Sequence, residues 1–233
     1  MIELSVVIPV YNEAPILEAA LRLLHGRLRA LGPSFEILLA ENGSRDDTAG
    51  IAARLAHELP EVRLWRGPEP NYGRALRAGI LEARGEIVVC DEIDIGDVDF
   101  YKRALPLLTA GADLVVGSKR HPESADRRPW IRRRGTAAIN GLLRVALGFR
   151  GSDTHGLKAL RRTALLPVID ACTVEHDLFA SELVIRAARM GLDVREIPLT
   201  LAEIRPPSVG LWRRVPRVLR DVARLVYAIR VRG

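Results

Sequence analysis

Three carboxylates follow a short apolar stretch near the middle of the chain. Residues 87–90 read Ile-Val-Val-Cys, and Asp91, Glu92 and Asp94 come directly after them. Such a run after Gly85 predicts a buried strand of a parallel sheet, and these sheets bind ligands at the carboxyl ends of their strands. Carboxylates can hold Mg²⁺ or Mn²⁺ while diphosphate oxygens fill the remaining positions. The alternative is an acidic helix start, because carboxylates also stabilise helix N-termini.

Polar segments also follow three other apolar stretches that predict strands, at residues 4–10, 35–40 and 113–117. Right-handed crossovers bring the carboxyl ends of parallel strands to one edge, where the segments are expected to form a single site. A nucleotide suits such an edge, because Glu13 or Glu41 can accept hydrogen bonds from a base. Each segment alone is equally consistent with a helix cap or a turn. The polar segments are 9–13, 41–46 and 117–120.

A further loop, at residues 71–74, has a composition that suits phosphate binding. Gly73 would let the backbone approach a phosphate, and Arg74 would supply a positive charge. Neither a Gly-x-Gly-x-x-Gly fingerprint nor a Walker lysine loop follows the first predicted strand. The sequence therefore argues against a dinucleotide oxidoreductase and against a P-loop enzyme.

The predicted strands alternate with stretches that predict amphipathic helices. This alternation predicts an α/β fold, with a mostly parallel sheet and helices on both faces. The periodicity stops at residue 118, and residues 119–134 read as a mobile basic segment. We expect early helices at residues 14–30, 72–83 and 98–109, and a further helix that follows the polar segment 41–46 and ends at residue 57. We expect strands at residues 62–65 and 87–90. Later we expect a helix at 135–147, a polar turn at 153–158, a helix at 179–190 and a strand at 193–200.

The chain is strongly basic, and arginine accounts for most of the excess charge. Its 233 residues carry a formal net charge of +6, with arginines gathered at residues 127–134 and 205–232. Clustered arginine indicates phosphate-rich partners such as nucleic acid, nucleotides or anionic lipids. Nucleic acid is not expected, because the arginines lack interleaved aromatic residues and no helix-turn-helix or RNA-binding signature is present.

Cysteine content and hydropathy indicate a cytoplasmic protein. Cys90 and Cys172 lack metal-binding spacing, which favours a reducing compartment. The first residues do not resemble a signal peptide, and no stretch approaches the roughly 20 apolar residues of a bilayer crossing. We expect one domain at residues 1–205 and a basic helical tail at residues 206–233.

The tail predicts a basic amphipathic helix over residues 209–233, interrupted at Pro216. Such a helix suits a peripheral anchor on the inner face of a membrane. Trp212, beside Arg213 and Arg214, favours that interpretation. The alternative is a helix that packs on the domain or forms a homodimer contact.

Several of these segments together resemble one enzyme family. Residues 6–13, 41–46, 71–79 and 91–94 look like the nucleotide-sugar half of a family 2 glycosyltransferase with the GT-A fold. Later segments resemble the branch that includes dolichyl-phosphate mannose synthase and bacterial polyprenyl-phosphate glycosyltransferases. The likeness covers about residues 4–205, and the first strand with its loop is the most typical part. The later segments are 117–120, 153–158 and 179–182.

The resemblance implies a nucleotide site and a metal site. Asp91 matches the first acid of the family's metal motif, but the second acid should lie two residues later, where the chain has Ile93. Either Asp94 or Glu92 substitutes, or metal binding is altered, and we expect Mg²⁺ or Mn²⁺ at Asp91 and Asp94. The expected nucleotide-binding residues are Pro9, Tyr11, Glu13, Glu41, Asn71, Gly73 and Arg74.

The resemblance also implies the reaction. The phosphate of a polyprenyl or dolichyl lipid attacks the anomeric carbon of a hexose while GDP or UDP leaves, with inversion. This nucleophile is already anionic at pH 7, so the site needs cations rather than a strong base. Each basic residue alone is also consistent with a solvated loop. The catalytic candidates are Asp91, Lys119, Arg120 and Arg133, and the acceptor-phosphate candidates are Arg120, Arg133, Arg134 and His155.

Two alternatives remain open from the residues. One is a transferase of the same fold with a non-lipid glycan acceptor, which would not require a lipid phosphate. The other is a catalytically weak nucleotide-sugar-binding protein, which Ile93 in the metal motif would explain. The expected partners are a nucleotide sugar, a polyprenyl phosphate and a membrane surface.

Overall fold

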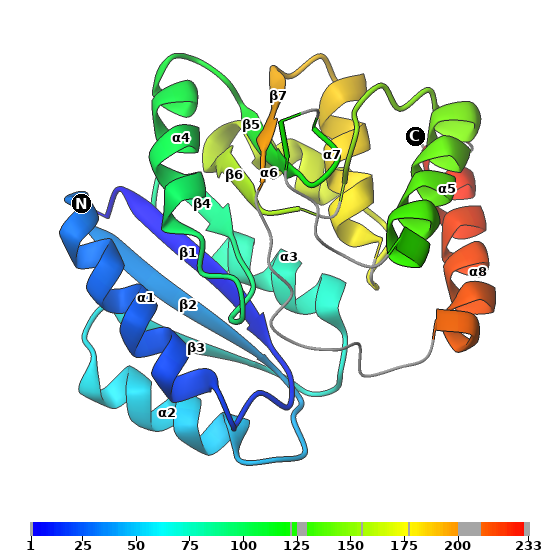
Figure 1. Cartoon of the computed structure of the whole chain (residues 1–233). Coiled ribbons are helices and arrows are strands. Elements are labelled where there is room, and N and C mark those ends of the chain that lie inside the picture. Colours follow the sequence, from blue (N-terminus) through cyan, green and yellow to red (C-terminus); the bar gives the residue numbers. More distant parts are fainter. Residues whose placement is uncertain are drawn as a thin grey trace.

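A computed structural model of the chain confirms the expected α/β class (Figure 1). It describes residues 2–121, 123–124, 130–154, 156–176, 178–199 and 211–230, with the backbone alone at residues 130–133, 136, 139 and 211–219. Within these ranges, seven strands form one mostly parallel sheet in the order β3-β2-β1-β4-β6-β5-β7. The strands are β1 (Leu4–Val10), β2 (Phe35–Asn42), β3 (Val62–Gly67), β4 (Ile87–Cys90), β5 (Leu114–Ser118), β6 (Lys158–Arg161) and β7 (Val194–Pro198).

The central strands are apolar because helices cover both faces of the sheet. β1 pairs in parallel with β2 and β4, so Val6 lies between Ile37 and Val89. Successive side chains of a strand point to opposite faces, and Val7 and Ile8 accordingly belong to two different apolar clusters. Figure 1 shows the two helical layers. One layer holds α1 (Leu17–Leu31), α2 (Thr48–Glu58) and α4 (Val98–Thr109), and the other holds α3 (Tyr72–Glu82), α6 (Arg162–Ala171) and α7 (Phe179–Arg189).

The sequence did not predict β6 or the helix α6 that follows it. β6 lies antiparallel between β4 and β5, and its first residue, Lys158, is opposite both Cys90 and Val116. The prediction of a polar turn through residue 158 is therefore wrong at its end. Four residues reading Lys-Ala-Leu-Arg carry too little apolar patterning to predict a buried strand.

α5 (Trp130–Leu147) and α8 (Leu211–Arg230) pack against each other at one side of the molecule (Figure 1). The prediction of a mobile basic segment is wrong from residue 130 onward, because α5 begins there. The predicted interruption at Pro216 is also wrong, because α8 is helical across that position. Leu225 and Ile229 are buried in the same apolar cluster as α7. The end of α8 therefore packs on the domain, as the alternative to a membrane anchor predicted.

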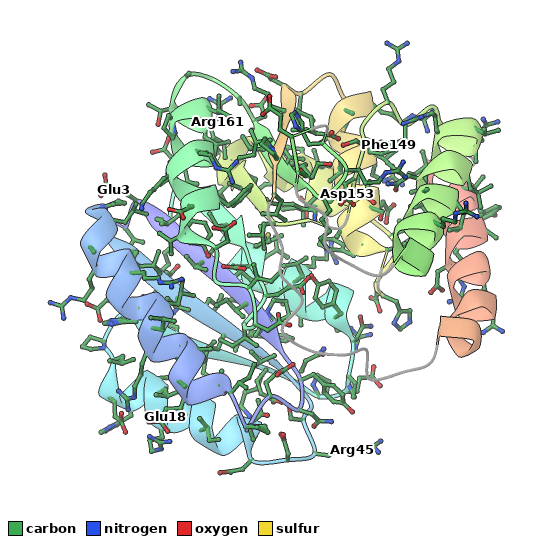
Figure 2. All side chains as sticks on the ribbon, viewed as in Figure 1. Glu3, Glu18, Arg45, Phe149, Asp153 and Arg161 are labelled. Atoms are coloured by element: carbon green, nitrogen blue, oxygen red, sulfur yellow. The ribbon has the colours of Figure 1, made fainter. Side chains whose placement is uncertain are left out.

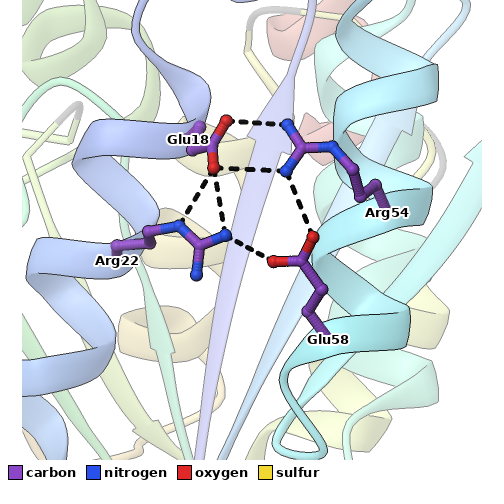
Figure 3. Close-up of polar contacts among 4 residues, drawn as sticks. All are labelled: Glu18, Arg22, Arg54 and Glu58. Carbon is purple, nitrogen blue, oxygen red and sulfur yellow. Dashed lines mark hydrogen bonds and ion pairs between the residues drawn. The ribbon is translucent and has the colours of Figure 1, made fainter.

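Four charged side chains join α1 to α2 on the outside of the molecule (Figure 3). Glu18 accepts hydrogen bonds from Arg54 (2.7 Å) and from Arg22 one helical turn away (3.0 Å). These hydrogen bonds, the one from Arg54 above all, lower the pKa of Glu18 to about 2. Glu58 completes the network by pairing with both arginines. The network links the exposed faces of two helices that lie outside β1 and β2.

Candidate active site

The loops after β1 and β2 are tied to each other by hydrogen bonds. The backbone N–H of Asn12 donates to Ser44 Oγ (3.0 Å), and the N–H of Arg45 donates to Asn12 Oδ1 (2.8 Å). The N–H of Glu13 donates to Thr48 Oγ1 at the start of α2 (2.8 Å). Asn12 has a φ of 54°, a conformation that asparagine adopts more readily than most residues. The two loops therefore meet at one edge, and Arg45 extends outward from it (Figure 2).

The residues expected to hold the base and ribose differ in their exposure. Tyr11 is 37% exposed, whereas Pro9 and Glu13 are half-buried. Glu41 is buried, and its Oε1 accepts a backbone N–H from the next turn (2.6 Å) while its Oε2 faces Arg66 Nε at 3.9 Å. The ring of Tyr11 is thus open to a ligand, and the carboxylate of Glu41 shapes the loop from within.

The start of α3 contacts the loop that precedes α7. Asn71 caps α3 by accepting the N–H of Arg74 at 3.1 Å. A Cβ on Gly73 would overlap the carbonyl oxygen of Glu175, so only glycine fits there. The guanidinium of Arg74 forms ion pairs with Glu69 (2.9 Å) and Glu175 (2.8 Å). In this arrangement Gly73 serves a contact between two protein loops, and two carboxylates balance the charge of Arg74.

Asp91 is buried beneath the loop that follows β4. Its Oδ2 accepts the hydroxyl hydrogen of Tyr101 from α4, and its Oδ1 accepts the N–H of Glu92 (2.7 Å). Burial raises the pKa of Asp91 to about 7, although both hydrogen bonds oppose the shift. Both oxygens of this carboxylate are therefore used inside the protein.

The residues after Asp91 diverge. Ile93 packs into the apolar cluster on the α4 side of the sheet, while Asp94 is exposed. Burial raises the pKa of Glu92, and the nearby ammonium groups of Lys119 and Lys158 oppose that shift. The carboxylate of Glu92 therefore lies near the ammonium groups of two lysines, whereas the side chain of Asp94 is exposed to solvent.

The carboxylates fit a metal site only in part. Within the described ranges no three His, Cys, Asp or Glu side chains converge on one point. Mg²⁺ is, however, commonly held by one or two carboxylates together with substrate phosphates. Asp94 suits that role, because it is exposed and accepts no hydrogen bond from the described residues. Asp91 is positioned to support the loop from below.

The turn before β6 is fixed to the end of β5. Asp153, labelled in Figure 2, is fully buried, and its Oδ2 accepts the N–H of Lys119 at 3.2 Å. Thr154 shares a hydrogen bond with Ser181 of α7 at 2.8 Å. A Cβ on Gly156 would overlap the backbone of β5, so this turn and the strand are in close contact. The turn therefore fixes the backbone from which the Lys119 side chain extends.

The structure describes the side chains of only two of the four residues expected to bind the acceptor phosphate. Arg120 is exposed in the turn after β5, and Arg134 is exposed on α5. The side chain of Arg133 and the whole of His155 lie outside the described residues. Their proposed contact with an acceptor phosphate stays a prediction.

Two buried side chains at the site were not anticipated from the sequence. Tyr101 lies on a correctly predicted helix, but no sequence signal pairs it with Asp91 across ten positions. Lys158 was read as the end of a polar turn, and only the placement of β6 brings it beside Glu92. Recognising the antiparallel strand would have been the one way to find it.

Comparison with known proteins identifies relatives along almost the whole chain. Glycosyltransferase AglD of Haloferax volcanii is 31% identical over 99% of this chain, which spans 38% of the length of AglD. The polyprenol monophosphomannose synthase of Mycolicibacterium smegmatis is 32% identical over 85% of this chain and 77% of its own length. These relatives confirm the resemblance to glycosyltransferases that was drawn from the sequence motifs.

Solved structures support the same fold. Glucosyl-3-phosphoglycerate synthase of Mycobacterium tuberculosis, solved with Mn²⁺, UDP-glucose and phosphoglyceric acid, superposes with a TM-score of 0.71 at 22% identity. The match covers 96% of this chain and 79% of the synthase, which confirms a GT-A-like fold. The model of the family described as glycosyl transferase family 2 matches residues 5–167. The chain therefore belongs to glycosyl transferase family 2.

Proposed function

We propose that the chain is an inverting hexosyltransferase that moves a sugar from a GDP- or UDP-linked donor to a polyprenyl or dolichyl phosphate. One observation carries this proposal. Lys119 and Arg120 follow β5 at the edge where the nucleotide-side loops lie, and neither side chain forms an ion pair with a residue in the described ranges. Unpaired cations at the site are the groups that draw in an anionic acceptor. The name of the mycobacterial relative supports the same acceptor class.

The donor would bind at the loops after β1 and β2, with Tyr11 against the base. We propose that Asp94 holds the expected Mg²⁺ or Mn²⁺ together with the donor's diphosphate. The cation, when bound, would stabilise the charge that develops on the departing nucleoside diphosphate. Asp91 would hold the loop that carries Asp94, through its hydrogen bonds with Tyr101 and Glu92.

The acceptor would bind on the β5 side of the same edge. Its phosphate oxygen is the nucleophile, and Lys119 with Arg120 would offset the repulsion between two phosphate-bearing substrates. The turn that carries Asp153 would keep the Lys119 backbone fixed while the side chain contacts the acceptor. No side chain needs to remove a proton from this nucleophile.

A lipid acceptor implies that the protein works at a membrane surface, on its cytoplasmic face. No helix in the described part of the chain is long and apolar enough to span a membrane. We propose peripheral binding, supported by the excess of arginine in residues 205–232. Sedimentation with phosphatidylglycerol vesicles, but not with phosphatidylcholine vesicles, would support it. Gel filtration would report whether the protein is a homodimer.

A transfer assay tests the proposal. Radiolabelled UDP-glucose or GDP-mannose is incubated with undecaprenyl phosphate, detergent and Mn²⁺, and the label is followed into the lipid phase. We expect transfer from one donor, and we expect Lys119→Met to lower it by raising the acceptor KM. Exposed Lys102 is the matched control, because Lys102→Met removes the same charge on α4, where Lys102 pairs with Asp99. Donor consumption that never labels lipid would instead support a non-lipid acceptor.

A further inference from the structure

A chain of hydrogen bonds runs from the turn after β5 to a carboxylate of β7. The backbone N–H of Arg120 donates to Ser118 Oγ at 3.1 Å. Ser118 Oγ and Ser152 Oγ share a hydrogen bond, and the Ser152 hydroxyl donates to Glu196 Oε2. Glu196 Oε1 also accepts the backbone N–H of Ser152 at 2.7 Å. These hydrogen bonds connect the end of β5, the turn before β6 and β7.

The direction of each hydrogen bond follows from the carboxylate. An ionised carboxylate accepts hydrogen bonds and donates none, so the hydroxyl hydrogen of Ser152 points to Glu196. Ser152 Oγ then accepts the hydroxyl hydrogen of Ser118, because its own hydrogen is already used. Ser118 Oγ is left as an acceptor, and the N–H of Arg120 donates to it. Glu196 thus orients both hydroxyl groups and, through them, the backbone at Arg120.

Strand pairing explains how a carboxylate of β7 reaches this turn. β5 and β7 lie side by side and pair in parallel, with Glu196 opposite Val116 (Figure 1). Paired residues share a face of the sheet, as do residues two apart in one strand, so Glu196 and Ser118 lie on one face. Val116 belongs to the same apolar cluster as Leu143 of α5. The carboxylate is therefore on the side of the sheet that α5 covers.

Ser152 also joins this chain of hydrogen bonds to α5. Its carbonyl oxygen accepts a hydrogen bond from Nδ2 of Asn140, a buried residue of α5, at 2.7 Å. α5 carries Arg134, one of the residues expected to bind the acceptor phosphate, and Arg120 is another. One serine thus contacts both elements that carry these cations, and Glu196 holds that serine by two hydrogen bonds.

We propose that Glu196 is a positioning residue, which acts through Ser152 to hold the turn after β5 so that Lys119 and Arg120 meet the acceptor phosphate. This inference rests on the proposed transfer to a phosphate acceptor. Cations stabilise a developing charge best when the protein holds them in place before the substrate binds. A shift of their backbone should therefore weaken acceptor binding, whereas the nucleotide loops after β1 and β2 should keep their affinity.

The test uses Glu196→Gln, Ser152→Ala and the double variant. Glu196→Gln keeps the shape of the side chain but leaves one oxygen for two donors, and Ser152→Ala removes the hydroxyl alone. Glu36→Gln is the matched control. Glu36 of β2 also accepts a serine hydroxyl, from Ser5 at 2.6 Å, and a backbone N–H, from Arg84 at 2.7 Å. These contacts lie near the start of β1, at the opposite edge of the sheet.

Steady-state transfer to undecaprenyl phosphate gives the acceptor KM and kcat of each protein, and calorimetry with UDP and GDP gives the nucleotide Kd. We expect Glu196→Gln and Ser152→Ala each to raise the acceptor KM about tenfold, within the range for residues that act on a site through intermediate contacts. The nucleotide Kd and kcat should stay within about twofold. The double variant should be no worse than the poorer single variant, because both residues act in one chain.

A second measurement does not depend on the lipid. Amide hydrogen exchange followed by NMR reports on the N–H of Arg120, which donates to Ser118. Glu196→Gln and Ser152→Ala should both speed exchange at Arg120, whereas Glu36→Gln should not.

Melting curves by circular dichroism distinguish positioning from a general loss of stability. Glu36→Gln should lower the melting temperature at least as much as Glu196→Gln, because Glu36 also pairs with Arg63 at 2.8 Å. It should nevertheless leave the acceptor KM unchanged. If Glu196→Gln does not fold, Ser152→Ala carries the same test, because it interrupts the same chain of hydrogen bonds.

The outcomes separate the inference from the proposed function. An unchanged acceptor KM in folded Glu196→Gln overturns the inference, as does an equal rise in Glu36→Gln. Effects of Glu196→Gln and Ser152→Ala that multiply in the double variant also overturn it. Wild-type protein that binds neither nucleotide, or never labels the lipid, overturns the proposed function itself. Exchange at Arg120 then still decides whether Glu196 positions the turn.

Discussion

A buried carboxylate on α7 provides the sharpest stability prediction. Glu182 is fully buried, and it accepts the N–H groups of Thr173 (3.0 Å) and Val174 (2.7 Å) and Nε of Arg186 (2.8 Å). Arg186 in turn donates to the carbonyl oxygen of Ala228 in α8 at 3.1 Å. This chain of hydrogen bonds joins α7 to the loop after α6 and to α8. Glu182 lies in the segment 179–182 that resembles polyprenyl-phosphate glycosyltransferases. Its hydrogen bonds hold neighbouring parts of the protein together.

The change Glu182→Gln keeps the shape of the side chain and removes its charge. The amide has one oxygen for three donors, so its NH₂ group must face either Arg186 or the two backbone N–H groups. Breaking a buried ion pair by removing one partner costs about 3–5 kcal/mol, and we expect about 3 because part of the bonding survives. With a urea m-value of about 2–3 kcal/mol/M, the midpoint should fall by about 1–1.5 M.

Urea unfolding followed by circular dichroism measures this change. Glu18→Gln is the matched control, because Glu18 and Arg22 form the same i,i+4 pair on an exposed surface (Figure 3). Exposed pairs contribute little, so the control should unfold close to the wild type. The reasoning is refuted if Glu182→Gln and Glu18→Gln shift the midpoint equally at an unchanged m-value.

Three further predictions concern the site and its surroundings. Asp94→Asn should abolish the effect of Mn²⁺ on nucleotide binding in calorimetry, whereas Glu92→Gln should retain it; the reverse result would move the metal to Glu92. Gly73→Ala should lower the melting temperature, because its Cβ would overlap the loop before α7, and an unchanged melting curve would contradict that close contact. Burial raises the pKa of the Cys90 thiol to about 12 and raises that of Cys172 as well. Since only the thiolate is nucleophilic, neither cysteine should react with iodoacetamide at pH 8 until urea unfolds the protein.

The first half of the sheet could be predicted because each strand carries its own signal. β1 and β4 are short, almost entirely apolar runs with helices covering both faces, and their length and β-branched residues identify them as strands. β6 has only four residues and begins with a lysine, so its burial depends on neighbours distant in sequence. α8 was predicted as a helix, but a basic amphipathic pattern does not distinguish a membrane surface from a protein surface. The last turns of α8 pack against α5 and α7, so their apolar face covers a protein surface.

The composition of the site could be predicted better than the orientation of its side chains. Parallel strands guarantee that the loops after β1, β2 and β4 share one edge, and the structure brings those after β1 and β2 into contact. Orientation depends on partners from other elements. Asp91 points inward because Tyr101 of α4 donates to it, and Arg74 is held by Glu69 and Glu175. Neither partnership leaves a trace in the local sequence.

The antiparallel strand gives this edge of the sheet a buried positive charge. Strands β1, β2 and β4 end at this edge and supply loops, but strand β6 begins there. Its first residue can therefore place a charge inside the sheet, below the loops, where a loop residue would be exposed to solvent. Lys158 is that residue, and its ammonium group lies near the carboxylates of Glu92 and Asp153. Lys119 and Arg120 instead follow β5, where Lys119 is half-buried and Arg120 is exposed. The reversed strand thus carries a buried charge in the sheet, while the loop after β5 carries the charges that we propose bind the acceptor.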